Sequence, residues 1–429
     1  MGKVRILILA IGISFTLGFV ARSVGAWIWV ATAKFDEVLP GRMLTKSEVA
    51  QLLGRRMISG APLKSSETLT YKDSSLNVQY SIDPRLQQTI EEKLKKGKVP
   101  YAAFVAMDAR TGQIVAMASH GRGQENLNLR ASFPAASIFK IVTAAAALET
   151  GRLRPESLIP VRGGYHTLYK QNVLAGGIEP SPRSRYTRLI SFQDALAKSV
   201  NSVFGKVGIF GVGPENLKKI SERFQFGRHI PFEMPVELSH APIPDDDFGI
   251  AEAASGYTRK NTLSPLHGVL IAAAVANDGV MMEPSIVSRL TTLDGDVRYN
   301  FEPKTLDKVL DPRTAENLSI MMNKTIINGT SRHAFRGRTR NSVLSELFIG
   351  GKTGTLNGWD PVGRYDWFVG FAEHEGTRLA VAALCIHDAY RGVKASQIAR
   401  SAFEAYFKPV VAENPPERIG HERTRKKTI

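Results

Sequence analysis

The order of the expected secondary-structure elements restricts the fold more than any other feature of the sequence. Strand-like apolar segments are expected near both ends of the chain, at 101–108, 113–119, 347–355, 366–373 and 378–387. Between them lies a mostly helical region, with helices expected at 193–207, 265–277 and 314–327. Short connections favour antiparallel neighbours. The pattern therefore predicts an α+β fold, with one antiparallel sheet, flanking helices and an inserted helical region.

Ser137 and Lys140 lie three residues apart at the start of an alanine-rich helix that is expected to end near Gly151. Residues i and i+3 share a helix face, so the amine can lie within reach of the hydroxyl. A serine becomes a strong nucleophile when a base takes its proton, and a lysine with a lowered pKa can be that base. The pair predicts acyl transfer, although alone it also fits a capping serine beside a solvated lysine.

Two further motifs follow in sequence. Ser199-Val-Asn201 lies in an expected helix, and Lys352-Thr-Gly-Thr355 lies in an expected strand after two glycines. A Ser-x-x-Lys pair, a Ser-x-Asn-type element and Lys-Thr-Gly form one set in penicillin-binding proteins and class A β-lactamases. A second Ser-x-Asn, at 75–77, precedes the nucleophile and is set aside.

Composition narrows the class of protein. The chain has 429 residues, 43% apolar and 22% charged, enough for one large or two moderate domains. The single cysteine, Cys385, excludes an internal disulfide framework and fits a small buried hydrophobe. The net charge of +16 favours an anionic membrane or cell-wall partner, and no nucleic-acid-binding signature accompanies it. The nine histidines lack ligand spacing, so we expect no metal and no cofactor.

The N-terminus carries two uncharged, largely apolar stretches, 6–21 and 23–33, after a short basic start. Their length favours a transmembrane signal-anchor at 6–30, with residues 1–5 in the cytoplasm. Small residues at 24–26 and 31–33 leave a cleaved signal peptide as the alternative. Either reading predicts that most of the chain is exported.

Three regions are expected after the anchor. Residues 34–80 read as a short membrane-proximal segment, with a capping box at Thr45-Lys-Ser-Glu48. The catalytic domain is expected at 81–410 and begins with a helix that Asp83 caps. Residues 411–429 hold two prolines and a basic run and are expected to form a disordered tail.

From about Ser81 to Phe407 the chain resembles the transpeptidase domain of penicillin-binding proteins, in particular the monofunctional, class B-like members. Besides the three motifs, the likeness covers the stretches 82–87, 108–118, 264–267, 276–279, 328–330 and 367–371. The resemblance implies the penicillin-binding transpeptidase and serine β-lactamase-like fold. It also implies a bacterial cytoplasmic-membrane protein with a single membrane pass and its catalytic domain outside the cytoplasm.

The resemblance implies the following chemistry for the first two motifs. Ser137 would attack the D-Ala-D-Ala bond of a peptidoglycan stem peptide and form an acyl-enzyme, while Lys140 accepts its proton. Ser199 would relay a proton to the leaving amine between Lys140 and Lys352. Asn201 would hold the Lys140 amine and the substrate amide. An amine of a second stem peptide would then take the acyl group, and β-lactams would trap Ser137 covalently.

The third motif is implied to bind the substrate. Thr353 and Thr355 would hold the substrate carboxylate beside the charge of Lys352. Gly354 would let the substrate backbone approach the strand closely. The backbone N–H groups of Ser137 and Thr355 would form the oxyanion hole.

Two positions depart from the family pattern. Ala136 stands where the family often has Gly, and Ile138 where it often has Thr. Both residues flank the nucleophile, so we expect an unusual reaction rate or β-lactam affinity. The chain also leaves no room for the glycosyltransferase domain of bifunctional members. We therefore expect a membrane glycosyltransferase partner, of the shape–elongation–division–sporulation type, contacting residues 6–80. The alternatives are a D,D-carboxypeptidase or β-lactamase on the same fold, or a degenerate scaffold or β-lactam sensor.

Overall fold

The computed structural model describes residues 42–57, 63–71, 74–121, 126–180, 187–389 and 392–413. The signal-anchor expected at 6–30 lies outside these residues, as does most of the tail expected at 411–429. No helix within the described ranges is both long enough and apolar enough to cross a membrane.

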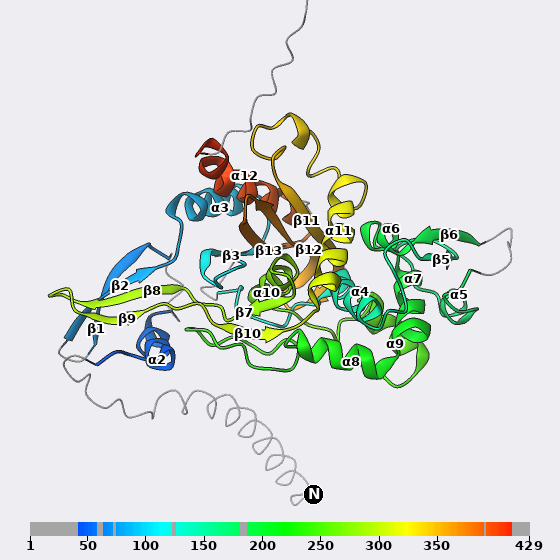
Figure 1. Ribbon diagram of the computed structural model, residues 1–429, viewed down its shortest axis with the longest axis horizontal. Helices are drawn as coiled ribbons and strands as arrows, with labels where there is room; N and C mark the ends of the chain where they lie inside the picture. The colour runs from blue at the N-terminus through cyan, green and yellow to red at the C-terminus, as the bar shows by residue number, and fades with distance from the viewer. Residues whose placement is uncertain are drawn as a thin grey trace, which may run out of the picture.

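A five-stranded antiparallel sheet forms the centre of the molecule (Figure 1). Its order is β11-β12-β13-β3-β4, so three C-terminal strands pair with two N-terminal strands. The strands are β3 (Tyr101–Asp108), β4 (Ile114–His120), β11 (Phe348–Trp359), β12 (Val362–His374) and β13 (Thr377–His387). This arrangement confirms the sheet that the sequence predicts, with β11 continuing past its expected end.

The two faces of this sheet pack against different helices because side chains alternate along each strand. In β3, Ala103, Val105 and Met107 share a core with α10 (Pro265–Ala276), a helix buried on every side. The residues between them face α3 (Pro84–Lys96) and α12 (Ala395–Glu413). Asp83 caps α3 as predicted, accepting hydrogen bonds from the backbone N–H groups of Arg85 and Leu86.

A helical region lies beside the sheet, between its N- and C-terminal strands in sequence (teal through green to yellow in Figure 1). Its helices are η1 (Ala136–Phe139), α4 (Lys140–Glu149), α5 (Lys170–Leu174), α6 (Phe192–Ala197), α7 (Asn201–Lys206), η2 (Val207–Val212), α8 (Pro214–Arg223), α9 (Asp247–Ser255), α11 (Pro312–Ile327) and η3 (Arg338–Arg340). The described residues also form two-stranded sheets. In one, β5 (Leu158–Val161) pairs with β6 (Arg188–Ser191), and in another, β7 (Val280–Met282) pairs with β10 (Thr305–Lys308). Helices α10 and α11 confirm two predictions, whereas the short strands were not predicted.

A second antiparallel sheet joins the segment before residue 81 to the catalytic domain. Its order is β1-β2-β8-β9, with bounds Ser66–Tyr71, Ser74–Tyr80, Val287–Thr292 and Val297–Asn300. Val49 and Leu53 of α2 (Lys46–Met57) belong to the same buried cluster as Leu76 and Val78 of β2. The boundary expected at residue 81 therefore crosses a continuous sheet and core.

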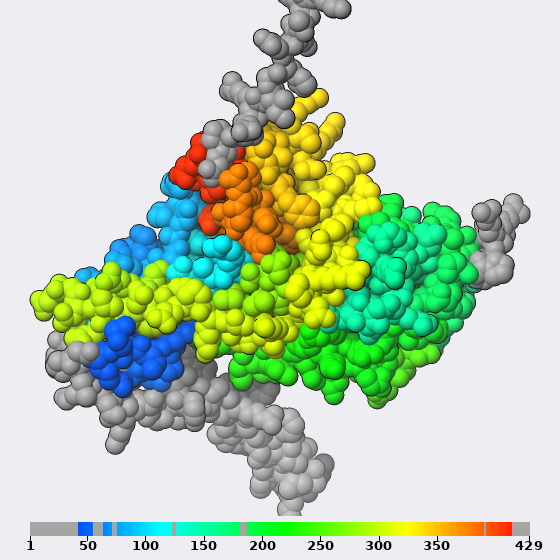
Figure 2. Space-filling model, viewed as in Figure 1, coloured from blue at the N-terminus to red at the C-terminus, as the bar shows by residue number. Residues whose placement is uncertain are grey.

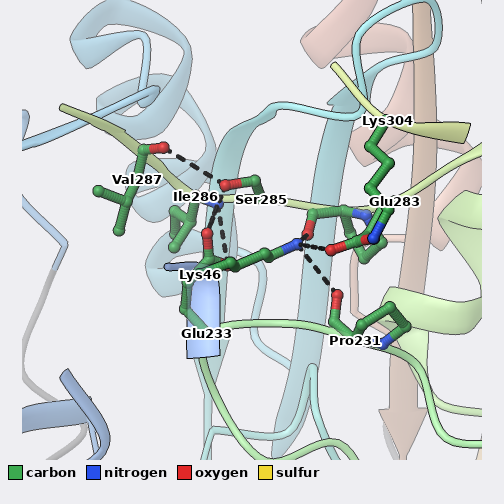
Figure 3. A network of polar contacts seen from close by, with 9 residues as sticks. Lys46, Pro231, Glu233, Glu283, Ser285, Ile286, Val287 and Lys304 are labelled. Carbon is green, nitrogen blue, oxygen red and sulfur yellow. Dashed lines mark hydrogen bonds and ion pairs between the residues drawn. The ribbon is translucent and has the colours of Figure 1, made fainter. Parts of the chain in front are cut away.

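Helix α2 begins with the predicted capping box. Thr45 N donates to Glu48 Oε2 at 2.8 Å, and Thr45 Oγ1 donates to the same oxygen at 2.8 Å. The Lys46 ammonium then crosses from α2 to Glu283 Oε1 at 2.8 Å and to the carbonyl of Pro231 at 3.2 Å (Figure 3). Burial alone would raise the pKa of Glu283, but Lys46 and Lys304 outweigh it and lower that pKa.

Candidate active site

The nucleophile turn lies where η1 meets α4. Ser137 is half-buried in the 3-10 helix, and Lys140, the first residue of α4, is fully buried. Lys140 Nζ lies 2.7 Å from Ser137 Oγ, as their shared helix face predicts. Trp367 of β12 holds the turn against the sheet, because its indole N–H donates to the Pro134 carbonyl at 2.9 Å.

Lys140 has two further polar contacts in this buried site. Its Nζ donates to Asn201 Oδ1 at 2.7 Å and to the Ser255 carbonyl at the end of α9. Burial, followed by the positive charge of Lys352, holds the pKa of Lys140 well below its ordinary value of 10.5. The environment therefore favours the neutral amine, which can act as a base.

Ser199 lies at a helix break, so the single helix predicted over 193–207 is wrong. Helix α6 ends at Ala197 and α7 starts at Asn201, with Ser199 at φ 57° between them. The amides of Ser199 and Val200 donate to the carbonyls of Leu196 and Ala195, at 3.1 Å and 2.9 Å. These two bonds are a Schellman motif, which usually has glycine at the left-handed position. The break lets Ser199 and Asn201 face two different lysines.

Lys352 is the second buried lysine of the site. Its Nζ donates to Ser199 Oγ at 2.9 Å and to the Thr353 carbonyl at 2.8 Å. Burial lowers the pKa of Lys352 to about 7. In the part of the chain that the structure describes, Ser199 bonds Lys352 while Asn201 bonds Lys140. Ser199 was expected to bridge Lys140 and Lys352, and the structure shows its hydrogen bond to Lys352.

The Lys-Thr-Gly-Thr motif runs along β11, the edge strand of the sheet that faces η1. Thr355 is exposed, and Thr353 Oγ1 lies 2.5 Å from Thr330 Oγ1. A Cβ on Gly354 would lie 3.1 Å from Ile138 Cγ1 and 3.3 Å from the Ala135 carbonyl. Glycine at this position therefore lets β11 approach the nucleophile turn. The room that Gly354 is expected to leave for substrate backbone stays a prediction.

Ala136 adopts the left-handed backbone conformation beside the nucleophile, with φ 48°. Glycine reaches this region at little cost, whereas a residue with a Cβ is strained there. This conformation suits the Gly that the family resemblance suggests for this position. The turn is also packed closely, because a Cβ on Gly256 would lie 1.9 Å from the Ala136 carbonyl.

Further contributors to the site were not assigned roles from the sequence: Tyr165, His166, Ser255, Thr330 and Trp367. The Tyr165 carbonyl accepts a hydrogen bond from the backbone N–H of Asn201 at 2.7 Å. The His166 carbonyl accepts one from the side-chain amide of Asn201 at 2.9 Å. Burial, Lys140 and Lys352 together lower the pKa of His166. Thr330 and Trp367 lie in stretches that carry the family resemblance. Ser255 acts through its main chain, so its side-chain identity gave no signal.

Comparisons with known proteins agree with this geometry. The profile of the penicillin-binding protein transpeptidase domain matches residues 102–404. The chain is 27% identical over 383 residues to the peptidoglycan D,D-transpeptidase PbpA of Mycobacterium tuberculosis, covering 77% of this chain and 72% of that protein. It is 26% identical over 347 residues to PbpA of Mycolicibacterium smegmatis, covering 72% and 67% respectively.

Solved structures show the same fold. The penicillin G acyl-enzyme complex of M. tuberculosis penicillin-binding protein A matches with a TM-score of 0.61 and 25% identity, over 77% of this chain and 80% of that one. A D,D-transpeptidase domain from Eggerthella lenta matches with a TM-score of 0.64 and 23% identity, over 78% and 83%. The fold class inferred from the motifs and the element order is confirmed for the described residues.

Proposed function

The chain belongs to the penicillin-binding protein transpeptidase family, and we propose that it is a peptidoglycan D,D-transpeptidase with Ser137 as its nucleophile. The observation that carries the proposal is the contact between Lys140 Nζ and Ser137 Oγ, at 2.7 Å in a buried site. Relatives named as D,D-transpeptidases and a β-lactam acyl-enzyme structure support it.

The contacts of Lys140 fit a neutral amine. Asn201 Oδ1 and the Ser255 carbonyl can only accept hydrogen bonds, whereas the Ser137 hydroxyl can donate one. A neutral lysine has two N–H groups for the two carbonyl oxygens and one lone pair for the Ser137 proton. Lys140 is therefore oriented to take that proton as Ser137 attacks the carbonyl carbon between the two terminal D-alanines.

The leaving D-alanine needs a proton when the acyl-enzyme forms. Ser199 Oγ, bonded to the Lys352 ammonium, is the group we assign to this transfer. The Lys352 charge and the hydroxyls of Thr353 and Thr355 bind the substrate carboxylate. The backbone N–H groups of Ser137 and Thr355 stabilise the oxyanion, a contribution of about 3 kcal/mol per donor. Asn201 orients the Lys140 amine and the substrate amide.

The acyl group then passes to an amine of a second stem peptide, which forms the cross-link and releases Ser137. Water in place of the amine gives D,D-carboxypeptidase activity, and rapid hydrolysis of a β-lactam ester gives β-lactamase activity. A degenerate scaffold or sensor forms the ester without turning over peptide. The cross-linking reaction is favoured by the relatives' names.

The test is intact-mass spectrometry of the protein with benzylpenicillin over time, followed by an assay of stem-peptide cross-linking. We expect one stable adduct and a cross-linked product, both absent in Ser137→Ala. Ser132→Ala is the matched control, because this nearby serine has a buried hydroxyl without a partner in the described structure. An adduct that persists in Ser137→Ala would exclude this nucleophile, and rapid adduct loss with drug hydrolysis would indicate a β-lactamase.

We further propose that residues 6–30 anchor the protein in the bacterial cytoplasmic membrane, with the catalytic domain outside the cytoplasm. The apolar sequence supports this location. Cross-linking consumes glycan strands that a polymerase must supply, so we also propose a membrane glycosyltransferase partner. A variant lacking 6–30 should leave the membrane fraction and lose co-purification with the partner. Retention of both would contradict these two proposals.

A further inference from the structure

The segment after α11 carries a dense basic surface, which we call the arginine loop (residues 331–340). Arg332, Arg336, Arg338 and Arg340 fall within it, and the stretch 317–345 contains no Asp or Glu. Three of these arginines are exposed and Arg338 is partly exposed. Among the described residues, none of the four guanidinium groups forms an ion pair. Their charges are therefore available to an outside anion.

The arginine loop has a fixed backbone. Phe335 is 2% exposed and packs on Phe368 and Phe403, with ring centroids 5.9 Å and 6.4 Å away. Arg400 of α12 donates to the carbonyls of Ala334 and Arg336, at 3.0 Å and 2.9 Å. A fixed backbone presents the charges without a large ordering cost on binding.

Acidic groups near the loop do not neutralise it. Glu404 of α12 lies at its base and accepts the Asn341 side-chain amide at 2.6 Å. Arg400 adds a further positive charge beside it. The surface thus keeps a strong excess of positive charge.

The arginine loop starts at the wall of the active site. The residue before it is Thr330, whose hydroxyl lies 2.5 Å from Thr353 Oγ1 and whose N–H donates to the Ala197 carbonyl at 3.0 Å. An extended ligand with one group held at Thr353 can therefore continue onto the arginines.

The position of the arginine loop and the charge of the chain's own C-terminal residues indicate which anion binds it. The loop is at the top of Figure 1, yellow to gold, whereas α2, the described helix nearest in sequence to the expected anchor, is at the lower left. Figure 2 shows the same segment on the upper surface. The described residues nearest in sequence to the expected anchor therefore lie away from the arginines. The chain's own residues 414–429 have five Lys or Arg and two Glu, so they lack complementary charge.

We propose that the arginine loop binds carboxylate groups of neighbouring stem peptides on a peptidoglycan strand, while one stem peptide of that strand occupies the Ser137 site. The planar guanidinium forks match carboxylates in two-point contacts. The proposal rests on the transpeptidase function proposed above and adds a second contact surface for the same polymer, outside the catalytic groove.

The test compares two variants of the full-length protein in detergent, each with three positive charges removed. The first is Arg336→Gln/Arg338→Gln/Arg340→Gln. The control is Lys218→Gln/Lys219→Gln/Arg228→Gln, three exposed cations on α8 and the turn after it. Binding to insoluble peptidoglycan is measured by sedimentation at low and high salt. Vesicles containing an anionic phospholipid are the second probe, and the benzylpenicillin acylation rate is measured for each protein.

We expect the loop variant to bind peptidoglycan roughly ten-fold more weakly, because each exposed pair contributes a few-fold at most. Its binding should also depend less on salt, and its acylation rate should match the unaltered protein. In cross-linking assays, KM should rise for a polymeric substrate and stay constant for a short free peptide.

Three outcomes would overturn the proposal. They are unchanged peptidoglycan binding, an equal loss in the α8 control, and a loss confined to the anionic vesicles, which would assign the loop to lipid. Failure of the proposed function has a different signature, because the unaltered protein would then lack acylation and cross-linking whatever it binds.

Discussion

At the residue scale, the proposed mechanism requires two buried lysines with different proton affinities. Lys140 must be neutral to accept the Ser137 proton, and burial together with Lys352 lowers its pKa. Lys352 must be a cation to hold the substrate carboxylate, yet burial lowers its pKa to about 7. As pH rises, the acylation rate should therefore increase when Lys140 loses its proton. It should decrease when Lys352 loses its proton.

This opposition predicts a falling alkaline limb for the second-order acylation rate with benzylpenicillin, with a midpoint near the Lys352 pKa of about 7. Lys352→Arg keeps the positive charge at every accessible pH. The variant should be slower because its geometry differs, but its alkaline limb should disappear. Intact-mass kinetics from acid to alkaline pH measure both profiles. An identical alkaline limb in the variant would show that another group causes it.

Ala136 provides a second test at the residue scale, because its backbone conformation suits glycine. Ala136→Gly removes left-handed strain of about 1 kcal/mol, partly offset by the extra freedom of glycine in the unfolded chain. The neighbouring Ala135 has an ordinary helical φ of −63°, so Ala135→Gly should destabilise by about 0.5–1 kcal/mol. Urea unfolding of both variants gives the comparison. Equal destabilisation would contradict the assigned conformation.

At the scale of elements, the sequence predicted what local patterns encode. Helices α10 and α11 and the five strands of the central sheet follow from long apolar segments with clear turn residues. The pairs β5–β6 and β7–β10 were missed because strands of three or four residues leave no periodic pattern. The break at Ser199 was missed because apolar residues continue across it and serine rarely adopts positive φ.

The same distinction applies to the site. Ser137 and Lys140 were predicted from their three-residue spacing, and Lys352 from the Lys-Thr-Gly motif. These predictions were possible because the motifs are defined by the side chains themselves. The Ser255 and His166 carbonyls were not found, because any residue can supply a main-chain oxygen. The reason for Gly354 also required the structure, since it depends on how β11 packs against η1.

Helix α2 supplies a prediction at this scale, through its contact with Glu283 (Figure 3). Lys46→Ala leaves a carboxylate that is 9% exposed with Lys304 as its remaining partner. We expect a loss of about 1–3 kcal/mol at neutral pH, less than for a fully buried pair that loses its only partner. Gln51→Ala, on the exposed side of α2, is the control and should change stability little.

The pH dependence gives this prediction its sign. The folded-state pKa of Glu283 is lowered, so its pair contributes stability above the unfolded-state pKa of about 4.3, and this is lost as pH falls through the folded-state pKa. The difference between Lys46→Ala and the unaltered protein should therefore shrink towards acid pH. Urea unfolding at neutral and acid pH measures it. A difference that does not change with pH would assign the loss to packing by the lysine stem.

At the scale of the whole molecule, the second sheet and the buried core continue across residue 81, where the catalytic domain was expected to begin. Strand β2 pairs with β8, and Leu76, Val78 and Tyr80 are at most 6% exposed. Burying three such side chains contributes roughly 5–9 kcal/mol as an upper estimate. That is comparable to the whole stability of an ordinary domain, about 5–15 kcal/mol. The strands before residue 81 therefore belong to the folded unit that carries the active site.

Two truncated proteins test this arrangement. A chain beginning at Leu63 keeps β1 and β2 and should remain folded and acylated by benzylpenicillin, with the stability lowered by the loss of α2. A chain beginning at Ser81 exposes the edge of β8, and an unpaired edge strand promotes association. We expect it to aggregate or to unfold at much lower urea concentration, as size-exclusion chromatography and urea unfolding would show. If it were monomeric and as stable as the longer chain, the second sheet would be an accessory to the catalytic domain and not part of its core.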